Sequence, residues 1–170
     1  MQDILDDIFR AYDVRGKDDQ LTDEVMRSIG HAFGTYVDEH GDDRIVVGHD
    51  ARMNSESLYE ALIEGIKASP IETIEQAGNE PFGVVQYHGW ANGSEIAYIT
   101  ASHLSKEWNG VKFYHQTGVG YAEEENMAIK DMIVDDRCVD EGETTVTTVD
   151  AHDAYIDFLN DTIDDIDLDI

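Results

Sequence analysis

The sequence predicts an α/β domain of three layers, in which a mostly parallel or mixed sheet is flanked by helices on both faces. Short apolar runs typical of strands alternate along the chain with longer segments whose apolar residues recur every three to four positions, as on one face of a helix. The run Ile45–Val47 is also too apolar for a sheet with one solvated face. A length of 170 residues, with 41% apolar residues and 2 prolines, fits one folded domain with a real core.

The first predicted elements are a short extended piece, Phe9–Gly16, and an amphipathic helix over residues 22–39. Thr22 is placed to cap this helix, and acidic residues follow it in the first turn, where the helix dipole favours negative charge. Gly30 and Gly34 lower the helix propensity, so we expect them to mark close packing against a neighbouring element.

Similar patterns predict the rest of the chain. Pro81 suits the first turn of a helix because its missing N–H would be unpaired there, and Asn109-Gly110 predicts a turn between two strands. We assign residues 1–160 to the domain, and residues 161–170 to an acidic tail or the start of a linker. The predicted elements are strand 44–48, a helix from residue 54 or 55 to about 69, strand 71–76, helix 81–91, strands 96–100 and 111–114, helix 121–134, a β-rich run 144–149 and helix 151–163.

The charge of the chain is strongly negative. There are 11 Lys and Arg residues against 38 Asp and Glu residues, which gives a net charge of −27 that is spread along the sequence. Such self-repulsion weakens a compact state, and salt relieves it because the Debye length falls to about 3 Å at 1 M. We therefore interpret the surface as halophilic. A generally acidic cytosolic protein and an acidic module for a basic partner are the alternatives, while the shortage of basic residues argues against nucleic-acid binding.

The sequence carries no signal for a membrane or for export. No apolar run approaches the roughly 18 residues that span a bilayer, and the N-terminus is acidic where a signal peptide is basic. Cys138 is the only cysteine, so it cannot form an internal disulfide, and we interpret it as a bystander thiol. These observations predict a soluble, cytoplasmic protein.

Three loops beside the predicted strands collect the side chains that could carry chemistry, namely Arg10–Gly16, Gly48–Arg52 and Thr100–Lys112. Sites of open α/β sheets lie beyond the carboxyl ends of strands, so we expect at least the second and third loops at one rim. On so acidic a surface, the basic residues among the candidates would form a local positive island suited to a phosphate. The candidates are Tyr12, Arg15, Asp50, Arg52, Ser102, His103, Asn109 and Lys112.

Each candidate also has a purely structural interpretation. Ser102 could be an ordinary turn serine, His103 a loop histidine bonded to the backbone, and Lys112 a solvated strand residue. The two arginines could form surface salt bridges, which contribute little to stability. Asp50 could orient the neighbouring arginine or cap a turn.

Other chemistries find no support in the sequence. It has no G-x-S-x-G elbow of an α/β-hydrolase, no glycine loop of a nucleotide-binding protein and no H-E-x-x-H or other zinc-ligand spacing. Trp90 and Trp108 fit packing positions better than platforms for a sugar ring.

Three segments in the same loops resemble the α-D-phosphohexomutases, which include phosphoglucomutase and phosphomannomutase. Phe9–Gly16 (FRAYDVRG) is similar to the N-terminal signature of the family, and Val47–Arg52 (VGHDAR) to its second motif. Thr100–His103 (TASH), followed by Asn109–Lys112 (NGVK), resembles its phosphoserine loop. Any one motif would be weak, but the three occur in the family order and the resemblance covers most of the chain.

The resemblance implies the phosphoserine-bearing first domain of an isomerase that interconverts hexose 1-phosphate and hexose 6-phosphate through a bisphosphate intermediate. Ser102 would carry the phosphoryl group and through it contact Mg²⁺, and a hexose 1,6-bisphosphate would act as activator. Arg15 and Lys112 would neutralise charge or shuttle the proton of the substrate hydroxyl, and His103 would help to shape the pocket. The implied substrate-binding residues are Tyr12, Asn109 and Arg52.

The sequence departs from the family pattern in several places. Leu104-Ser105 stands where the family commonly has Asn-Pro, and His49 stands where it usually has Arg, so a charge there is lost or becomes pH-dependent. The chain has no Asp-Gly-Asp-x-Asp loop, which supplies the Mg²⁺ ligands from the second domain of the family. The loops of the later domains that bind sugar and phosphate are also absent.

Three hypotheses follow from the resemblance. The chain is the first domain of a halophilic phosphohexomutase, inactive by itself; or it is a stand-alone binding module derived from that domain; or it is one part of a split mutase whose other domains come from a partner chain. The first hypothesis predicts an apolar patch where the next domain docks, and the second predicts a polar surface there.

Overall fold

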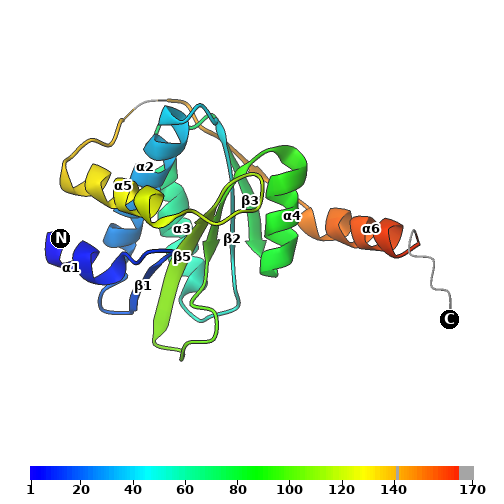
Figure 1. Cartoon of the computed structure of the whole chain (residues 1–170), viewed down its shortest axis with the longest axis horizontal. Helices are drawn as coiled ribbons and strands as arrows, with labels where there is room; N and C mark the ends of the chain where they lie inside the picture. Colours follow the sequence, from blue (N-terminus) through cyan, green and yellow to red (C-terminus); the bar gives the residue numbers. More distant parts are fainter. Residues whose placement is uncertain (141, 165–170) are drawn as a thin grey trace.

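The computed structural model describes residues 1–140 and 142–164, which form alternating strands and helices (Figure 1). The elements in chain order are α1 (Gln2–Ile8), β1 (Val14–Lys17), α2 (Asp23–Glu39), β2 (Arg44–His49), α3 (Ser55–Ile66), β3 (Thr73–Asn79), α4 (Phe82–Asn92), β4 (Glu95–Ile99), β5 (Trp108–Tyr114), α5 (Glu123–Val134), β6 (Thr145–Thr148) and α6 (Ala151–Asp164).

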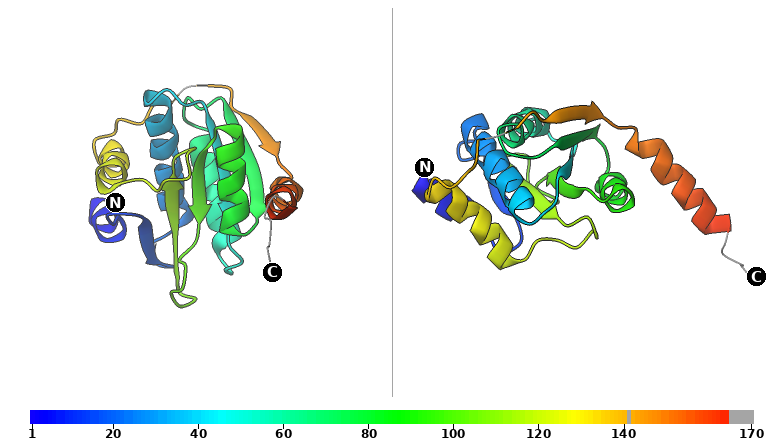
Figure 2. Two further views of the ribbon diagram at one scale, coloured as in Figure 1. Left: turned by 45° about the vertical axis from the view of Figure 1, so that its right-hand side comes forward. Right: turned by 90° about the horizontal axis from the view of Figure 1, so that it is seen from above.

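The strands form one mixed six-stranded sheet in the order β1-β5-β4-β2-β3-β6. β4, β2, β3 and β6 run parallel to one another, whereas β5 is antiparallel to both β4 and β1. Helices cover both faces of the sheet, with α2 and α3 on one side and α4 on the other (Figure 2). The predicted α/β fold with a mixed sheet is therefore confirmed.

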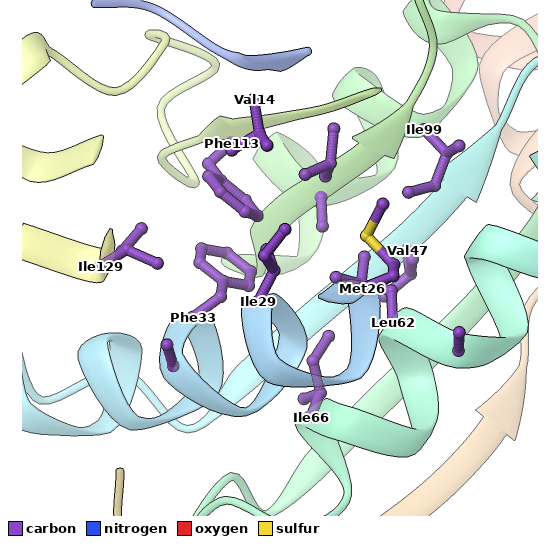
Figure 3. Close-up of a cluster of buried hydrophobic side chains, with 14 of the residues drawn as sticks. Val14, Met26, Ile29, Phe33, Val47, Leu62, Ile66, Ile99, Phe113 and Ile129 are labelled. Carbon is purple, nitrogen blue, oxygen red and sulfur yellow. The ribbon is translucent and has the colours of Figure 1, made fainter. Parts of the chain in front are cut away.

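The main core lies between the sheet and the α2–α3 layer (Figure 3). At its centre Phe33 of α2 stacks on Phe113 of β5, with ring centroids 4.1 Å apart. A smaller apolar cluster, which includes Val46, Val85 and Tyr98, joins the opposite face of the sheet to α4. Two packed faces explain why the central strands are apolar on both sides.

The prediction for residues 22–39 is confirmed by α2. The Thr22 hydroxyl accepts a hydrogen bond from the Val25 N–H at 3.3 Å, so Thr22 caps the helix as expected. The two glycines of α2 lie where α3 approaches: a Cβ at Gly30 would fall under 3.0 Å from the Leu62 carbonyl oxygen, and one at Gly34 equally close to Ser69. The expected close packing at both glycines is thus present.

The C-terminal helix α6 extends away from the rest of the domain and touches mainly the α4 side (Figure 2). Phe158 of α6 stacks on Tyr87 of α4, with ring centroids 4.6 Å apart. The predicted tail over residues 161–170 overlaps this helix, which continues to Asp164, while residues 165–170 lie outside the described residues.

The structure differs from the predictions in two further places. α1 was not predicted, because a segment of seven residues that buries only Leu5 and Ile8 is too short to show a clear periodicity. The predicted Asn109-Gly110 turn is wrong: both residues lie inside β5, where Asn109 pairs with Gly16 and Gly110 with Arg15. The pairing partner β1 extends the strand, and this tertiary contact overrides the local turn preference of the dipeptide.

None of the helices in residues 1–140 and 142–164 is long and apolar enough to cross a membrane.

Candidate functional site

The predicted loops meet because the carboxyl ends of two parallel strands are adjacent. His49, the last residue of β2, pairs with Ile99, the last residue of β4. The Gly48–Arg52 loop and the Thr100–Lys112 segment therefore lie side by side, and the Asp50 N–H donates to the Ile99 carbonyl at 3.0 Å. The expected juxtaposition of the second and third loops is confirmed.

Ser102 occupies an exposed turn just beyond β4. Its φ angle is 55°, in the left-handed region that non-glycine residues adopt at a cost. The Ser102 N–H donates to the Thr100 hydroxyl oxygen at 2.8 Å, and the Ser102 Oγ lies 3.3 Å from His103 Nδ1. The turn therefore presents a hydroxyl to solvent with an imidazole nitrogen within reach of its proton.

A pocket of about 270 Å³ opens beside this turn on the α4 face of the sheet. Lys112 reaches it because Val111 and Phe113 point into the main core, so the alternation of β5 sends Lys112 to the opposite face as predicted. The pocket is lined by Phe82, Tyr98, Thr100, Ser102, Lys112 and Tyr114.

The three aromatic residues of this pocket were not among the predicted site residues. The strand register contains the signal that would have found two of them, because Tyr98 pairs directly with Lys112, and Tyr114 lies two residues further along the same face. Burial raises the pKa of Tyr98 to about 12, and the nearby charges of Asp50 and Glu80 act in the same direction. Burial also raises the pKa of Tyr114, so both phenols stay neutral at physiological pH.

The basic residues near the pocket have acidic partners. Arg15 of β1 forms a 2.5 Å ion pair with Asp13, and Lys112 Nζ lies 4.0 Å from the same carboxylate. The Arg15 Nε is buried and has no hydrogen-bond partner among the described residues. Because Asp13 compensates part of their charge, the predicted positive island is weaker than the three basic residues alone suggested.

Arg52 is engaged with the Ser102 loop itself. Its Nε donates to Asp50 Oδ2 at 3.2 Å, and its two terminal nitrogens donate to four main-chain carbonyl oxygens. A guanidinium has five N–H donors, and five partners surround this one, so none is left for a ligand in this arrangement. The acceptors are the carbonyls of Ser102 at 2.7 Å, Leu104 at 2.8 Å, and Ser105 and Trp108 at 3.1 Å each.

The other two predicted substrate-binding residues lie in contrasting surroundings. Asn109 is fully buried, and its amide nitrogen donates to Asn54 Oδ1 at 2.7 Å and to Ser55 Oγ at 3.0 Å, so it fastens β5 to the start of α3. Tyr12 is 73% exposed in the segment before β1. Tyr12 is therefore accessible to a ligand that approaches from solvent. Asn109 is not accessible, and its hydrogen bonds give it a structural role.

The two tryptophans lie outside the pocket beside Ser102. Trp108 packs under Lys17, whose Nζ lies 5.6 Å from the ring centroid, whereas Trp90 is 57% exposed and lines a separate pocket of about 390 Å³ between α4 and α6. Within the described part of the chain, no group of three or more His, Cys, Asp or Glu side chains is arranged to hold a metal ion.

Comparison with known proteins relates this arrangement to one family. Residues 6–137 match the family described as "Phosphoglucomutase/phosphomannomutase, alpha/beta/alpha domain I". A phosphoglucomutase/phosphomannomutase from Thermococcus kodakarensis is 34% identical over 131 residues, which cover 74% of this chain and 28% of that protein. Phosphohexose mutases of Xanthomonas campestris are 32% identical over 162 residues, or 92% of this chain and 35% of theirs.

Solved structures agree with these matches. A phosphoglucomutase/phosphomannomutase family protein from Burkholderia thailandensis superposes with a TM-score of 0.83 at 29% identity, covering 96% of this chain and 36% of that one. The corresponding values for a phosphomannomutase-like protein from Thermus thermophilus are 0.79 and 25%, with 91% and 35% covered. The chain thus spans about a third of the length of these relatives. By its sequence and its fold, the chain belongs to the phosphoglucomutase/phosphomannomutase family, of which it represents the α/β/α domain I.

Proposed function

We propose that the chain is the phosphoserine-bearing domain of a phosphohexomutase that interconverts hexose 1-phosphate and hexose 6-phosphate, with Ser102 as the phosphoryl carrier. The observation that carries this proposal is the placement of Ser102. Its hydroxyl projects from an exposed left-handed turn beside His103 and lines the same pocket as Lys112. Phosphoryl transfer depends mainly on positioning and on neutralised charge, and this pocket offers both.

The proposed transfer uses groups on the α4 face of the sheet. A sugar hydroxyl attacks the phosphorus on Ser102, the bond from phosphorus to Ser102 Oγ breaks, and a new bond to the sugar oxygen forms. The hydroxyl proton leaves to a base, and the released Ser102 oxygen takes up a proton. His103 Nδ1, at 3.3 Å, is placed to exchange the proton of Ser102, and Lys112 is placed to meet the charge of the moving phosphoryl group.

Arg15 belongs to the same proposal. It lies on β1 opposite Gly110, and its side chain is 22% exposed, so its guanidinium could donate to a substrate oxygen. The short ion pair with Asp13 holds the guanidinium near Lys112, which approaches the same carboxylate. We propose Tyr12, on the exposed segment before β1, as a contact to the substrate from the solvent side.

Mg²⁺ fits this site only in part. A phosphate on Ser102 would supply one oxygen ligand, while the described residues contain no group of three or more His, Cys, Asp or Glu side chains that could fill the remaining positions. When bound, the ion would neutralise negative charge on the phosphate. We propose that its other ligands, and the contacts that select the sugar, come from further mutase domains, in the same polypeptide or on a partner chain, so that the isolated chain is inactive.

Exposed apolar side chains on the last helix support such further domains. α6 extends away from the domain (Figure 2). Three of its apolar side chains are exposed, namely Ile156 (42%), Phe158 (36%) and Ile163 (60%). A stand-alone module would gain nothing from apolar groups in water. This observation favours the first-domain hypothesis over the stand-alone module, and we propose that the domain body extends to about residue 160.

The proposal is tested by phosphate uptake. The chain, combined with the remaining mutase domains, is incubated with a hexose 1,6-bisphosphate and its intact mass is measured. We expect one phosphoryl group on the unmodified chain and none on the Ser102→Ala variant. Ser105→Ala, a neighbouring serine of the same loop, serves as the matched control and should still be phosphorylated. Uptake that persists in Ser102→Ala would refute the assignment of Ser102.

A further inference from the structure

The main-chain N–H and the main-chain carbonyl of Ser102 each form a hydrogen bond, one with Thr100 and one with Arg52. Both of these partners are bonded to the carboxylate of Asp50. On the N-terminal side, the Ser102 N–H donates to Thr100 Oγ1 at 2.8 Å. On the C-terminal side, the Ser102 carbonyl accepts from an Arg52 terminal nitrogen at 2.7 Å. The Thr100 hydroxyl in turn donates to Asp50 Oδ2 at 2.8 Å, and Arg52 Nε donates to the same oxygen at 3.2 Å.

We infer that Asp50 is a positioning residue for the phosphoryl transfer, acting through Thr100 and Arg52 to hold Ser102 in its left-handed conformation. The inference rests on the proposed function in one respect only, that Ser102 is the phosphoryl acceptor. Left-handed backbone is unfavourable for a non-glycine residue and persists only where its surroundings enforce it. The hydrogen bonds of Thr100 and Arg52 to Asp50 fix the backbone on both sides of Ser102. The four hydrogen bonds of Arg52 to main-chain carbonyls extend this constraint over the loop.

The other oxygen of Asp50 ties this arrangement to rigid structure. Asp50 Oδ1 accepts from the Ser55 hydroxyl at 2.6 Å, at the start of α3, and from the Arg52 main-chain N–H at 3.1 Å. Each carboxylate oxygen therefore faces one N–H of Arg52, a donor that cannot reverse its role. In an asparagine at position 50, one of the two oxygens would be replaced by an N–H₂ group, which would face an N–H of Arg52, donor against donor. A side chain of the same shape is therefore not sufficient, and the carboxylate is required.

The test separates positioning from overall stability. NMR measures the amide exchange of the 170-residue chain, and phosphate uptake is measured with the remaining mutase domains present. Loss of one hydrogen bond corresponds to about tenfold in an equilibrium. In Thr100→Val we expect exchange at Ser102 about tenfold faster, exchange in α2 unchanged, and uptake slowed about tenfold with little change in KM. Thr100→Ser, which keeps the hydroxyl, should restore both, and Asp50→Asn should behave like Thr100→Val.

Asp6→Asn, which removes a surface ion pair to Lys130 far from the loop, is the matched control and should alter neither quantity. If Ser102 exchange and uptake in Thr100→Val and Asp50→Asn stay within twofold of the parent, the positioning inference is overturned. It is equally overturned if exchange rises uniformly through the chain, because the network would then support only the fold. If exchange responds as expected but the unmodified protein takes up no phosphate at Ser102, the geometric inference stands and the phosphoryl-carrier function fails.

Discussion

Replacement of Gly30 by alanine should separate α2 from α3. Both helices come close because glycines face main chain: a Cβ at Gly30 would lie under 3.0 Å from the Leu62 carbonyl oxygen, and one at Gly65 equally close to the Arg27 carbonyl oxygen. These opposing atoms belong to helical backbone and cannot turn aside as a side chain would. The added methyl group must therefore move one helix as a whole.

The magnitude follows from two opposing effects. Alanine in a helix interior is favoured over glycine by about 1 kcal/mol. Overpacking of a filled core costs about 1–3 kcal/mol. The upper end applies here, because moving the helices apart by about 0.5–1 Å also removes a quarter to a half of the dispersion energy of each contact between them. We expect Gly30→Ala to lower the free energy of unfolding by about 2 kcal/mol, the difference between the steric cost and the propensity gain.

Urea unfolding followed by far-UV circular dichroism, in a constant high concentration of KCl, measures this change. Gly83→Ala is the matched control, because Gly83 lies in α4 with its nearest heavy atom, Tyr155 Oη, at an ordinary 3.4 Å from an added Cβ. This control should raise stability by up to about 1 kcal/mol. A Gly30→Ala protein as stable as the parent would refute the tight glycine-mediated packing of α2 on α3.

Three further predictions concern pH, the buried loop support and salt. Burial opposes ionisation of Glu75, but the ion-pair contact with His88, whose Nε2 lies 3.3 Å from Glu75 Oε2, and the hydrogen bond from Ser94 prevail and lower the pKa of Glu75 from 4.5 to about 2. Its contribution of about 3 kcal/mol to the free energy of unfolding is therefore present above pH 4.5 and lost as the pH falls to 2. Urea unfolding of Glu75→Gln should lack this loss, while the exposed Glu60→Gln should keep it. Asn109→Ala should lower the free energy of unfolding by about 2–3 kcal/mol, because the half-buried Asn54 and the buried Ser55 lose their hydrogen bonds to Asn109. An unchanged urea midpoint would contradict that assignment. We propose a halophilic surface from the net charge of −27, so multimolar KCl should favour folding in far-UV circular dichroism, and equal stability at low salt would exclude it.

Much of the fold was predictable because its signals are local. The amphipathic period of residues 22–39 and the apolar run of β2 report which face of each element is buried, and both predictions are confirmed. The meeting of two loops at Ser102 was also predictable, since parallel strands bring their carboxyl ends to one edge. In contrast, α1 is too short to show a periodic pattern, and Asn109-Gly110 has the composition of a turn although it lies in a strand.

The sequence by itself determined the fold class, the identity of the three motifs and the choice of Ser102 and Lys112 as candidates for the site. Only the tertiary structure decided how the neighbouring residues are used. The sequence left Arg52 open as a substrate-binding residue or a surface salt bridge. In the structure four of its five donors bind carbonyls 50 to 56 residues away, and Asp50 connects the two sides of Ser102. The physical reason is that helix and strand periods are set by near neighbours, whereas the partner of a hydrogen bond is set by whichever distant segment the fold brings within 3 Å.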